Sequence, residues 1–248
     1  MSCAGMGVIV TKNRKFWAFK AAEPGVGELQ LYGEISDRSW WGDEVTPKQF
    51  AADLDALGDI SILNVYINSP GGDVFAGQAI YSILKRHAAK VHVHVDGLAA
   101  SIASLVAMAG DTITMPANAM MMVHMPWTFA VGNAAELRKM ADDLDKIGES
   151  MVVTYEGRSA LTHEEVVALL EAETWLTAQD CLDRGLCDEV EEAKEVAACW
   201  DPAALARYRN TPATVPAAKQ PEPEPEPDKP AVDDELRRRR LALELDLI

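Results

Sequence analysis

Two serines lie within a segment whose other residues are almost all small or apolar. The segment is GLAASIASLVAMAG, residues 97–110, and it contains Ser101 and Ser104. A serine hydroxyl can act as a nucleophile when a base lies beside it and backbone N–H groups stabilise the oxyanion. We expect Ser101 at the start of a helix, where N–H groups are unpaired and the helix dipole favours negative charge. The segment by itself favours a simpler interpretation, in which both serines only permit close helix packing.

Two other motifs could complete such a site. The glycine pair in NSPGGDV, residues 68–74, follows a strand and precedes a helix, so an exposed N–H there could join an oxyanion hole. An ordinary strand-to-helix turn would carry the same glycines. His124 in MMMVHMP could be the base, although a histidine in an apolar strand is more often a core residue. His92 and His94 share one face of their strand and could chelate a metal, but no third ligand follows nearby in the sequence.

The elements expected to position these residues alternate between strands and helices, which is typical of an α/β fold. Strands are expected at 8–20, 28–35, 61–69, 90–95, 112–115, 120–125 and 186–193. Helices are expected from Pro47, after an N-cap at Thr46, and at 76–87, 100–110, 132–155, 162–171 and 178–184. Apolar residues in 132–155 recur every three or four positions, so this amphipathic helix packs on the core or faces a partner.

The composition excludes several classes of function. The chain has 248 residues, 48% of them hydrophobic, and a formal net charge of −16, so it is a poor candidate for binding nucleic acid. The sequence starts with no basic and apolar leader, and its longest apolar run is too short to span a bilayer, so no membrane partner is expected. The cysteines, Cys3, Cys181, Cys187 and Cys199, show no CxxC spacing, which indicates a reducing compartment without a disulfide framework or zinc knuckle.

The C-terminal part differs from the rest. We expect a folded domain over 1–205, an acidic proline-rich linker over 206–232 and a short helical or basic tail over 233–248. The linker and tail form a disordered C-terminal extension. The four arginines in the tail are weak evidence for a nucleic-acid site in so acidic a chain.

Four motifs in order, INSPGG, GLAASIAS, MMMVHMP and TWLTAQDCLDRGLCDEV, resemble the Clp-type serine proteases over roughly residues 28–192. The resemblance implies the ClpP/crotonase-like fold, built from repeated β-β-α units, and a protease that uses no cofactor and no metal. It implies Ser101 as nucleophile and His124 as general base. It also implies the backbone N–H groups of Gly72 and Ile102 as the oxyanion hole.

The acid of the implied triad departs from the family pattern. In the family that this chain resembles, the acid usually begins a pattern like D-[RK]-[FY]-[LM]-[ST]-A. This chain has ETWLTA instead, which places Glu173 at the position of the aspartate. A glutamate can still orient an imidazole, but its additional methylene changes its reach. Glu171 and Asp180 are alternative acids.

The segment LYGEISDRSWWGDEVTPKQFAADLDALG, residues 31–58, is similar to the ClpP-related head maturation proteases of tailed bacteriophages. This similarity implies an endopeptidase that cleaves capsid and scaffold precursors, forms a homo-oligomeric ring and contacts the portal or capsid shell through its tail. It would work in the bacterial host cytoplasm and the phage procapsid. The alternatives are a ClpP-type peptidase that works with an ATPase unfoldase, and a catalytically silent assembly protein. An acyl-CoA-binding crotonase has the same architecture, but the Ser–His pairing argues against it.

Overall fold

The computed structural model describes residues 15–36, 46–194 and 202–212. All of these belong to one compact unit, residues 1–218. The remaining residues, 219–248, form a second unit that lies outside the described residues, as does the predicted linker beyond residue 212. The start of the strand predicted at 8–20 is outside them as well, and so are Cys3 and Cys199.

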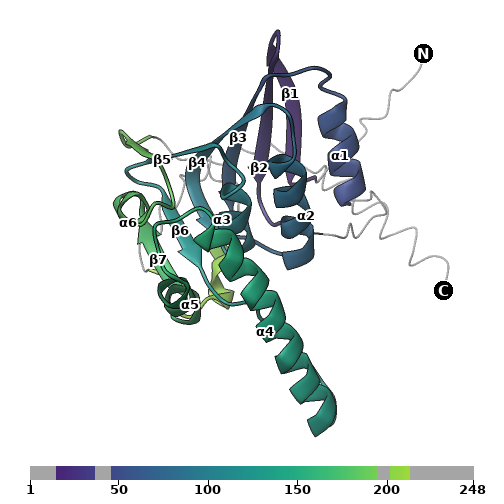
Figure 1. Cartoon of the computed structure of the whole chain (residues 1–248), viewed down its shortest axis with the longest axis vertical. Helices are drawn as coiled ribbons and strands as arrows, with labels where there is room; N and C mark the ends of the chain where they lie inside the picture. Colours follow the sequence, from purple (N-terminus) through teal and green to yellow (C-terminus); the bar gives the residue numbers. More distant parts are fainter. Residues whose placement is uncertain (1–14, 37–45, 195–201, 213–248) are drawn as a thin grey trace, which may run out of the picture. The chain divides into compact units, whose positions relative to one another are not determined.

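A mixed sheet is the centre of this unit (Figure 1). Its strands are β1 (Trp17–Glu23), β2 (Val26–Tyr32), β3 (Ile62–Ser69), β4 (Lys90–Ala100), β5 (Thr112–Pro116), β6 (Met120–Val123), β7 (Thr174–Thr177) and β8 (Glu189–Glu191). The strands pair in the order β1-β2-β3-β4-β5-β8, and β6 pairs with both β4 and β7. Pairing is parallel from β2 to β8 along this order and between β4 and β6, and it is antiparallel for β1–β2 and β6–β7.

Helices connect the parallel strands. They are α1 (Pro47–Asp55), α2 (Val74–Lys85), α3 (Ile102–Ala107), α4 (Ala134–Glu156), α5 (His163–Glu171) and α6 (Ala178–Asp183), followed by a 3-10 helix, η1 (Pro202–Arg207). The α/β class and the ClpP-type architecture expected from the sequence are confirmed. The predicted helix start after Thr46 is correct, because the Thr46 side chain accepts a hydrogen bond from Gln49 N. β7 and η1 were not predicted.

One boundary prediction was wrong at a position that matters. The strand expected to end at Val95 runs on to Ala100, and the helix expected from Ala100 begins only at Ile102. The residues of GLAAS are small, so their types do not distinguish a strand from a helix. What extends the strand is its parallel pairing with β6, in which Ala100 lies opposite Met122. Ser101 is therefore the single residue between a strand and a helix.

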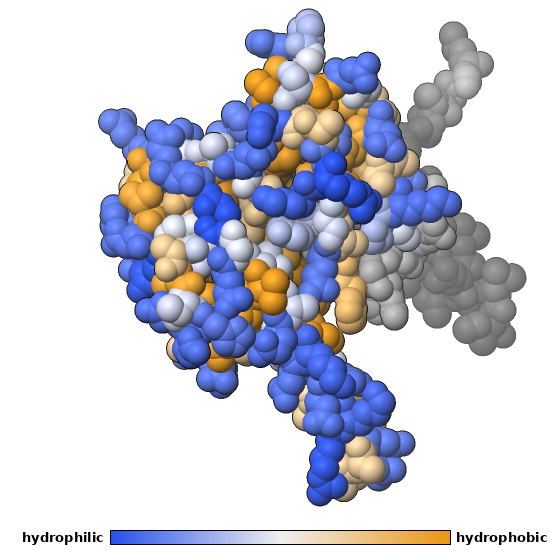
Figure 2. Space-filling view, in the orientation of Figure 1, coloured by the Kyte–Doolittle hydropathy of each residue, from blue (hydrophilic) through white to orange (hydrophobic). Residues whose placement is uncertain are grey.

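The α4 helix extends away from the sheet (Figure 1). Its buried residues lie in its C-terminal half, whereas Leu137 and Met140, near its N-terminal end, are exposed. In Figure 2 hydrophilic side chains cover most of the extending part, with small apolar patches between them. In the part of the chain that the structure describes, no helix has the length and apolarity needed to cross a membrane.

Candidate active site

The backbone at Ser101 has an unusual conformation. Its φ is 55° and its ψ is −130°, a combination that non-glycine residues rarely adopt. Such strain is found at functional sites, where the surrounding structure holds the residue in place. Here Ser101 N donates to Met122 O at 2.8 Å, which fixes the corner between β4 and α3 against β6. The strained turn directs the Ser101 side chain to the residue that follows β6.

That residue is His124. Ser101 Oγ and His124 Nε2 lie 2.6 Å apart, within hydrogen-bond distance, and each residue is 7% exposed. The sheet register explains the contact, because Ala100 pairs with Met122 and each reactive residue comes one or two positions later. The structure therefore brings together the predicted nucleophile and the predicted base. A nucleophile and base at this distance form the arrangement that an activated serine requires.

The surroundings of His124 keep its ring neutral. Burial lowers the pKa of His124 from 6.5 to about 4; the negative charge of Glu173 opposes this shift, and the charges of Arg207 and Arg209 add to it. A neutral imidazole can accept the proton of the Ser101 hydroxyl at neutral pH. The same surroundings make the protonated ring costly, so a catalytic cycle needs an acid that stabilises it.

The glycine motif lies directly against the nucleophile. Ile35 N donates to Gly71 O and Asp73 N donates to Ile35 O, both at 2.8 Å, so the N–H of Gly72 faces away from Ile35. A Cβ on Gly71 would lie 2.6 Å from Ser101 Cβ, and one on Gly72 would lie 1.9 Å from Ile35 O. Only glycine allows the two segments to approach this closely.

Two backbone donors remain for an oxyanion. Within the described residues, neither the N–H of Gly72 nor the N–H of Ile102, the first residue of α3, donates a hydrogen bond. Both belong to segments that contact Ser101, which is what an oxyanion hole requires. Their assignment as the oxyanion hole stays a prediction.

Glu173 is buried near the dyad but is engaged elsewhere. It is 5% exposed and has a φ of 51°, so the backbone holds it in the left-handed region. Its Oε1 accepts a hydrogen bond from Asn210 N at 2.6 Å, and Arg209 Nε lies 3.9 Å from Oε2. Among the described residues, the His124 side chain hydrogen-bonds to Ser101 and not to Glu173. Glu173 therefore acts on His124 through charge, and its role as triad acid stays a prediction.

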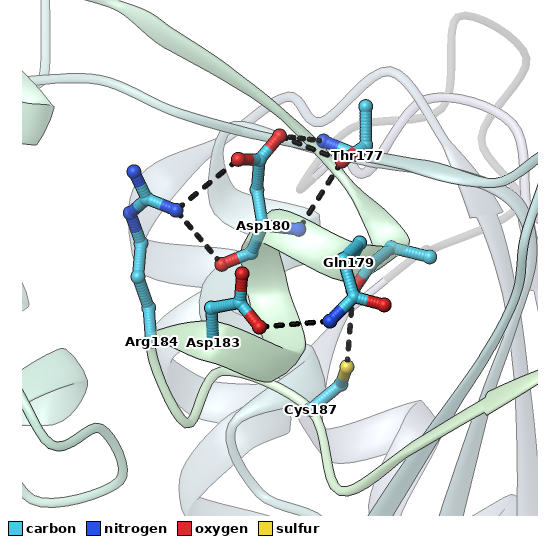
Figure 3. Close-up of polar contacts among 7 residues, drawn as sticks. Thr177, Gln179, Asp180, Asp183, Arg184 and Cys187 are labelled. Atoms are coloured by element: carbon cyan, nitrogen blue, oxygen red, sulfur yellow. Dashed lines mark hydrogen bonds and ion pairs between the residues drawn. The ribbon is translucent and has the colours of Figure 1, made fainter.

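Neither alternative acid lies in a suitable place. Asp180 belongs to the cap of α6, where its carboxylate accepts hydrogen bonds from the backbone and hydroxyl of Thr177 and pairs with Arg184 (Figure 3). These contacts lower the pKa of Asp180, the largest effect being the hydrogen bond from the Thr177 side chain. Glu171 ends α5 and is exposed. Glu173 is thus the buried acid whose charge reaches His124.

Ser104 is buried one turn beyond the nucleophile, as predicted. Its Oγ lies 2.6 Å from Ser101 O and 3.1 Å from Met122 O, and the Tyr155 hydroxyl is 2.8 Å away. Because carbonyl oxygens only accept, Ser104 shares its single proton between the two carbonyls, and the Tyr155 hydroxyl therefore donates to Ser104. No sequence motif pointed to Tyr155, which reaches this network from α4. This network holds the backbone carbonyl of Ser101 in place.

The remaining residues that sequence reasoning singled out lie apart from this site. Cys181 and Cys187 are buried free thiols, and burial raises the pKa of each. The His94 ring stacks on Tyr66 with their centroids 5.1 Å apart. Among the described residues, no group of three or more His, Cys, Asp or Glu side chains is arranged to hold a metal ion.

Comparison with known proteins agrees with the geometry. The family model for Clp protease matches residues 33–194, which is most of the described chain, and the protein belongs to the Clp protease family. Over 139 residues the chain is 31% identical to an ATP-dependent Clp protease proteolytic subunit of Bacteroides fragilis. That alignment covers 55% of this chain and 67% of the relative. A protein of the same name from strain YCH46 of the same organism is also 31% identical, over 63% of its own length.

Proposed function

We propose that this protein is a serine endopeptidase that hydrolyses polypeptides. The observation that supports this most directly is the 2.6 Å contact between Ser101 Oγ and His124 Nε2 at a strained strand-to-helix corner. Membership of the Clp protease family supports the same conclusion.

In the proposed mechanism Ser101 Oγ attacks the scissile carbonyl carbon, and His124 Nε2 takes the hydroxyl proton. The N–H groups of Gly72 and Ile102 donate to the oxyanion that forms. Glu173 stabilises the imidazolium through its negative charge, which offsets the burial that otherwise disfavours the protonated ring. His124 then gives the proton to the leaving amine, and water hydrolyses the acyl-enzyme through the same two residues.

The substrate that we propose is a capsid or scaffold precursor in the head assembly of a tailed bacteriophage. The similarity of residues 31–58 to the head maturation proteases supports this assignment. The described part of that segment places Ile35 against the glycine motif, so it contributes to the site itself. We also propose a homo-oligomeric ring, because the extending part of α4 exposes apolar side chains that a second copy would cover. The tail would contact the portal or the shell.

A general ClpP-type peptidase is the second candidate, favoured by the names of the Bacteroides relatives, which are proteolytic subunits of an ATP-dependent protease. The two candidates differ in whether an unfoldase is needed. We would incubate the full chain with an unfolded model protein such as casein, without ATP, and measure new N-termini. We expect cleavage that Ser101→Ala abolishes while its circular dichroism spectrum stays unchanged. Cleavage that survives Ser101→Ala would exclude Ser101 as the nucleophile.

A further inference from the structure

The described residues after the sheet, 202–212, lie over the catalytic dyad, and we call them the strap. Two of its side chains, Leu205 and Tyr208, are 4% and 6% exposed. They pack in one apolar cluster with Leu98, Ala100 and Met122, residues of β4 and β6 that lie one to three positions before Ser101 or His124. The strap therefore fills an apolar site beside Ser101 and His124.

Tyr208 makes the closest approach to the reactive groups. Its ring meets the His124 ring edge-on, with their centroids 5.3 Å apart, and its hydroxyl donates to Pro70 O. Burial raises the pKa of Tyr208, and the charge of Arg207 opposes this rise. Tyr208 thus occupies the space beside the nucleophile, against the His124 ring and the Pro70 carbonyl. A scissile carbonyl has to enter this space before Ser101 can attack it.

Polar contacts fasten the strap on both sides of the dyad. On one side Arg207 donates to Glu34 at 2.6 Å and to Pro70 O at 3.4 Å. On the other side Asn210 N donates to the carboxylate of Glu173 at 2.6 Å, and Asn210 Nδ2 donates to Ala172 O at 2.8 Å. The strap therefore holds the proposed triad acid while it covers the nucleophile.

We propose that the strap is an internal ligand of the apolar site formed by Leu98, Ala100 and Met122, and that it covers Ser101 and His124 until a polypeptide substrate displaces it. This proposal rests on the proposed function, since it names what regulates access to the nucleophile of the peptidase. Displacement also frees the Glu173 carboxylate to turn to His124.

The test compares the rate at which a fluorophosphonate labels Ser101 in three full-length proteins. In the double variant Leu205→Asp, Tyr208→Asp, two carboxylates would be buried in the apolar site, so the strap is expected to leave it. The control is Ala206→Asp, which adds one carboxylate at an exposed position of the strap instead of two at buried positions. If the strap covers the site in at least nine molecules of ten, the double variant is labelled about tenfold faster or more. The control should be labelled at the wild-type rate.

A peptide in trans provides a second measurement that does not depend on the fold of the variant strap. The peptide PAALARYRNTP, the sequence of residues 202–212, should slow labelling of the double variant. The same peptide with alanine in place of its tyrosine and of the leucine at position 205 should not. Equal labelling of the wild type and the double variant would overturn the proposal that the strap covers the nucleophile. The proposed function would not be affected.

Failure of the proposed function has a different signature, because no fluorophosphonate would then attach to Ser101 in any of the three proteins. The strap would in that case be tested by hydrogen–deuterium exchange at the backbone N–H of Asn210, which donates a hydrogen bond to the Glu173 carboxylate. Slow exchange in the wild type and fast exchange in the double variant would support an internal ligand at this site. Fast exchange in the wild type would overturn it.

Discussion

Acidification should destabilise this protein through one buried ring. The pKa of His124 is about 4 in the folded protein, against 6.5 for an unperturbed histidine, mainly because the ring is buried. Between these two pH values the unfolded chain binds a proton at position 124 and the folded protein does not. The free energy of unfolding therefore falls as the pH drops from 6.5 to 4, and below 4 this contribution stops changing.

The size of the effect follows from the shift. A difference of about 2.5 pKa units corresponds to about 3 kcal/mol, at roughly 1.4 kcal/mol for each unit. A loss of this size is a large fraction of the stability of an ordinary domain, which is about 5–15 kcal/mol. Besides burial, three charged side chains affect the pKa of His124: Glu173 raises it, and Arg207 and Arg209 lower it.

The assay is urea unfolding of the wild type and of His124→Gln at several pH values between 4 and 7.5. Carboxylates titrate in both proteins, so the difference between the two free energies isolates His124. We expect the wild type to lose about 3 kcal/mol more than His124→Gln over this range. If both proteins lose the same amount, His124 is not held neutral by burial, and the account of the base is wrong.

Three further predictions concern the acid, the glycine motif and the tail. Glu173→Gln should lower kcat by about tenfold or more because it removes the charge that stabilises the imidazolium, whereas the exposed Glu171→Gln should not; the reverse order would move the acid. Gly72→Ala should cost about 1–3 kcal/mol of stability and most of the activity, because its Cβ would lie 1.9 Å from a backbone oxygen. Gly58→Ala, with a φ of +72° but no atom within 4 Å, is the control for backbone strain alone, and urea unfolding with peptidase assays compares the two variants. Deleting residues 213–248 should leave peptide hydrolysis unchanged but reduce incorporation into phage heads; loss of hydrolysis would contradict the predicted role of the tail.

The sequence predicted those parts of the site that depend on short-range patterns. Ser101 and His124 could be identified because four motifs in order resemble the Clp-type serine proteases, whereas each segment by itself favoured a packing role. The pairing of β4 with β6 brings the two strand ends together. Thr46 could be found because a threonine before a proline is a local signal for a helix start.

The parts that the sequence could not predict depend on contacts between distant residues. The strand end at Ala100 is set by pairing with Met122, and no local pattern in a run of small residues reveals it. Tyr155 reaches Ser104 from 51 positions further along the chain. The position of the strap is the hardest feature to predict. Composition places residues 206–212 in a linker, but their contacts are with distant residues, such as Glu34 and Glu173. The domain boundary at 205 stays a prediction.

The most direct test of the central claim is whether His124 activates Ser101. We would treat the wild type and the strap double variant, Leu205→Asp, Tyr208→Asp, with a fluorophosphonate and locate the adduct by mass spectrometry, each protein with and without His124→Ala. The account predicts an adduct on Ser101 that disappears when His124 is replaced. An adduct that persists without His124, or no adduct on Ser101 in either background, would contradict it.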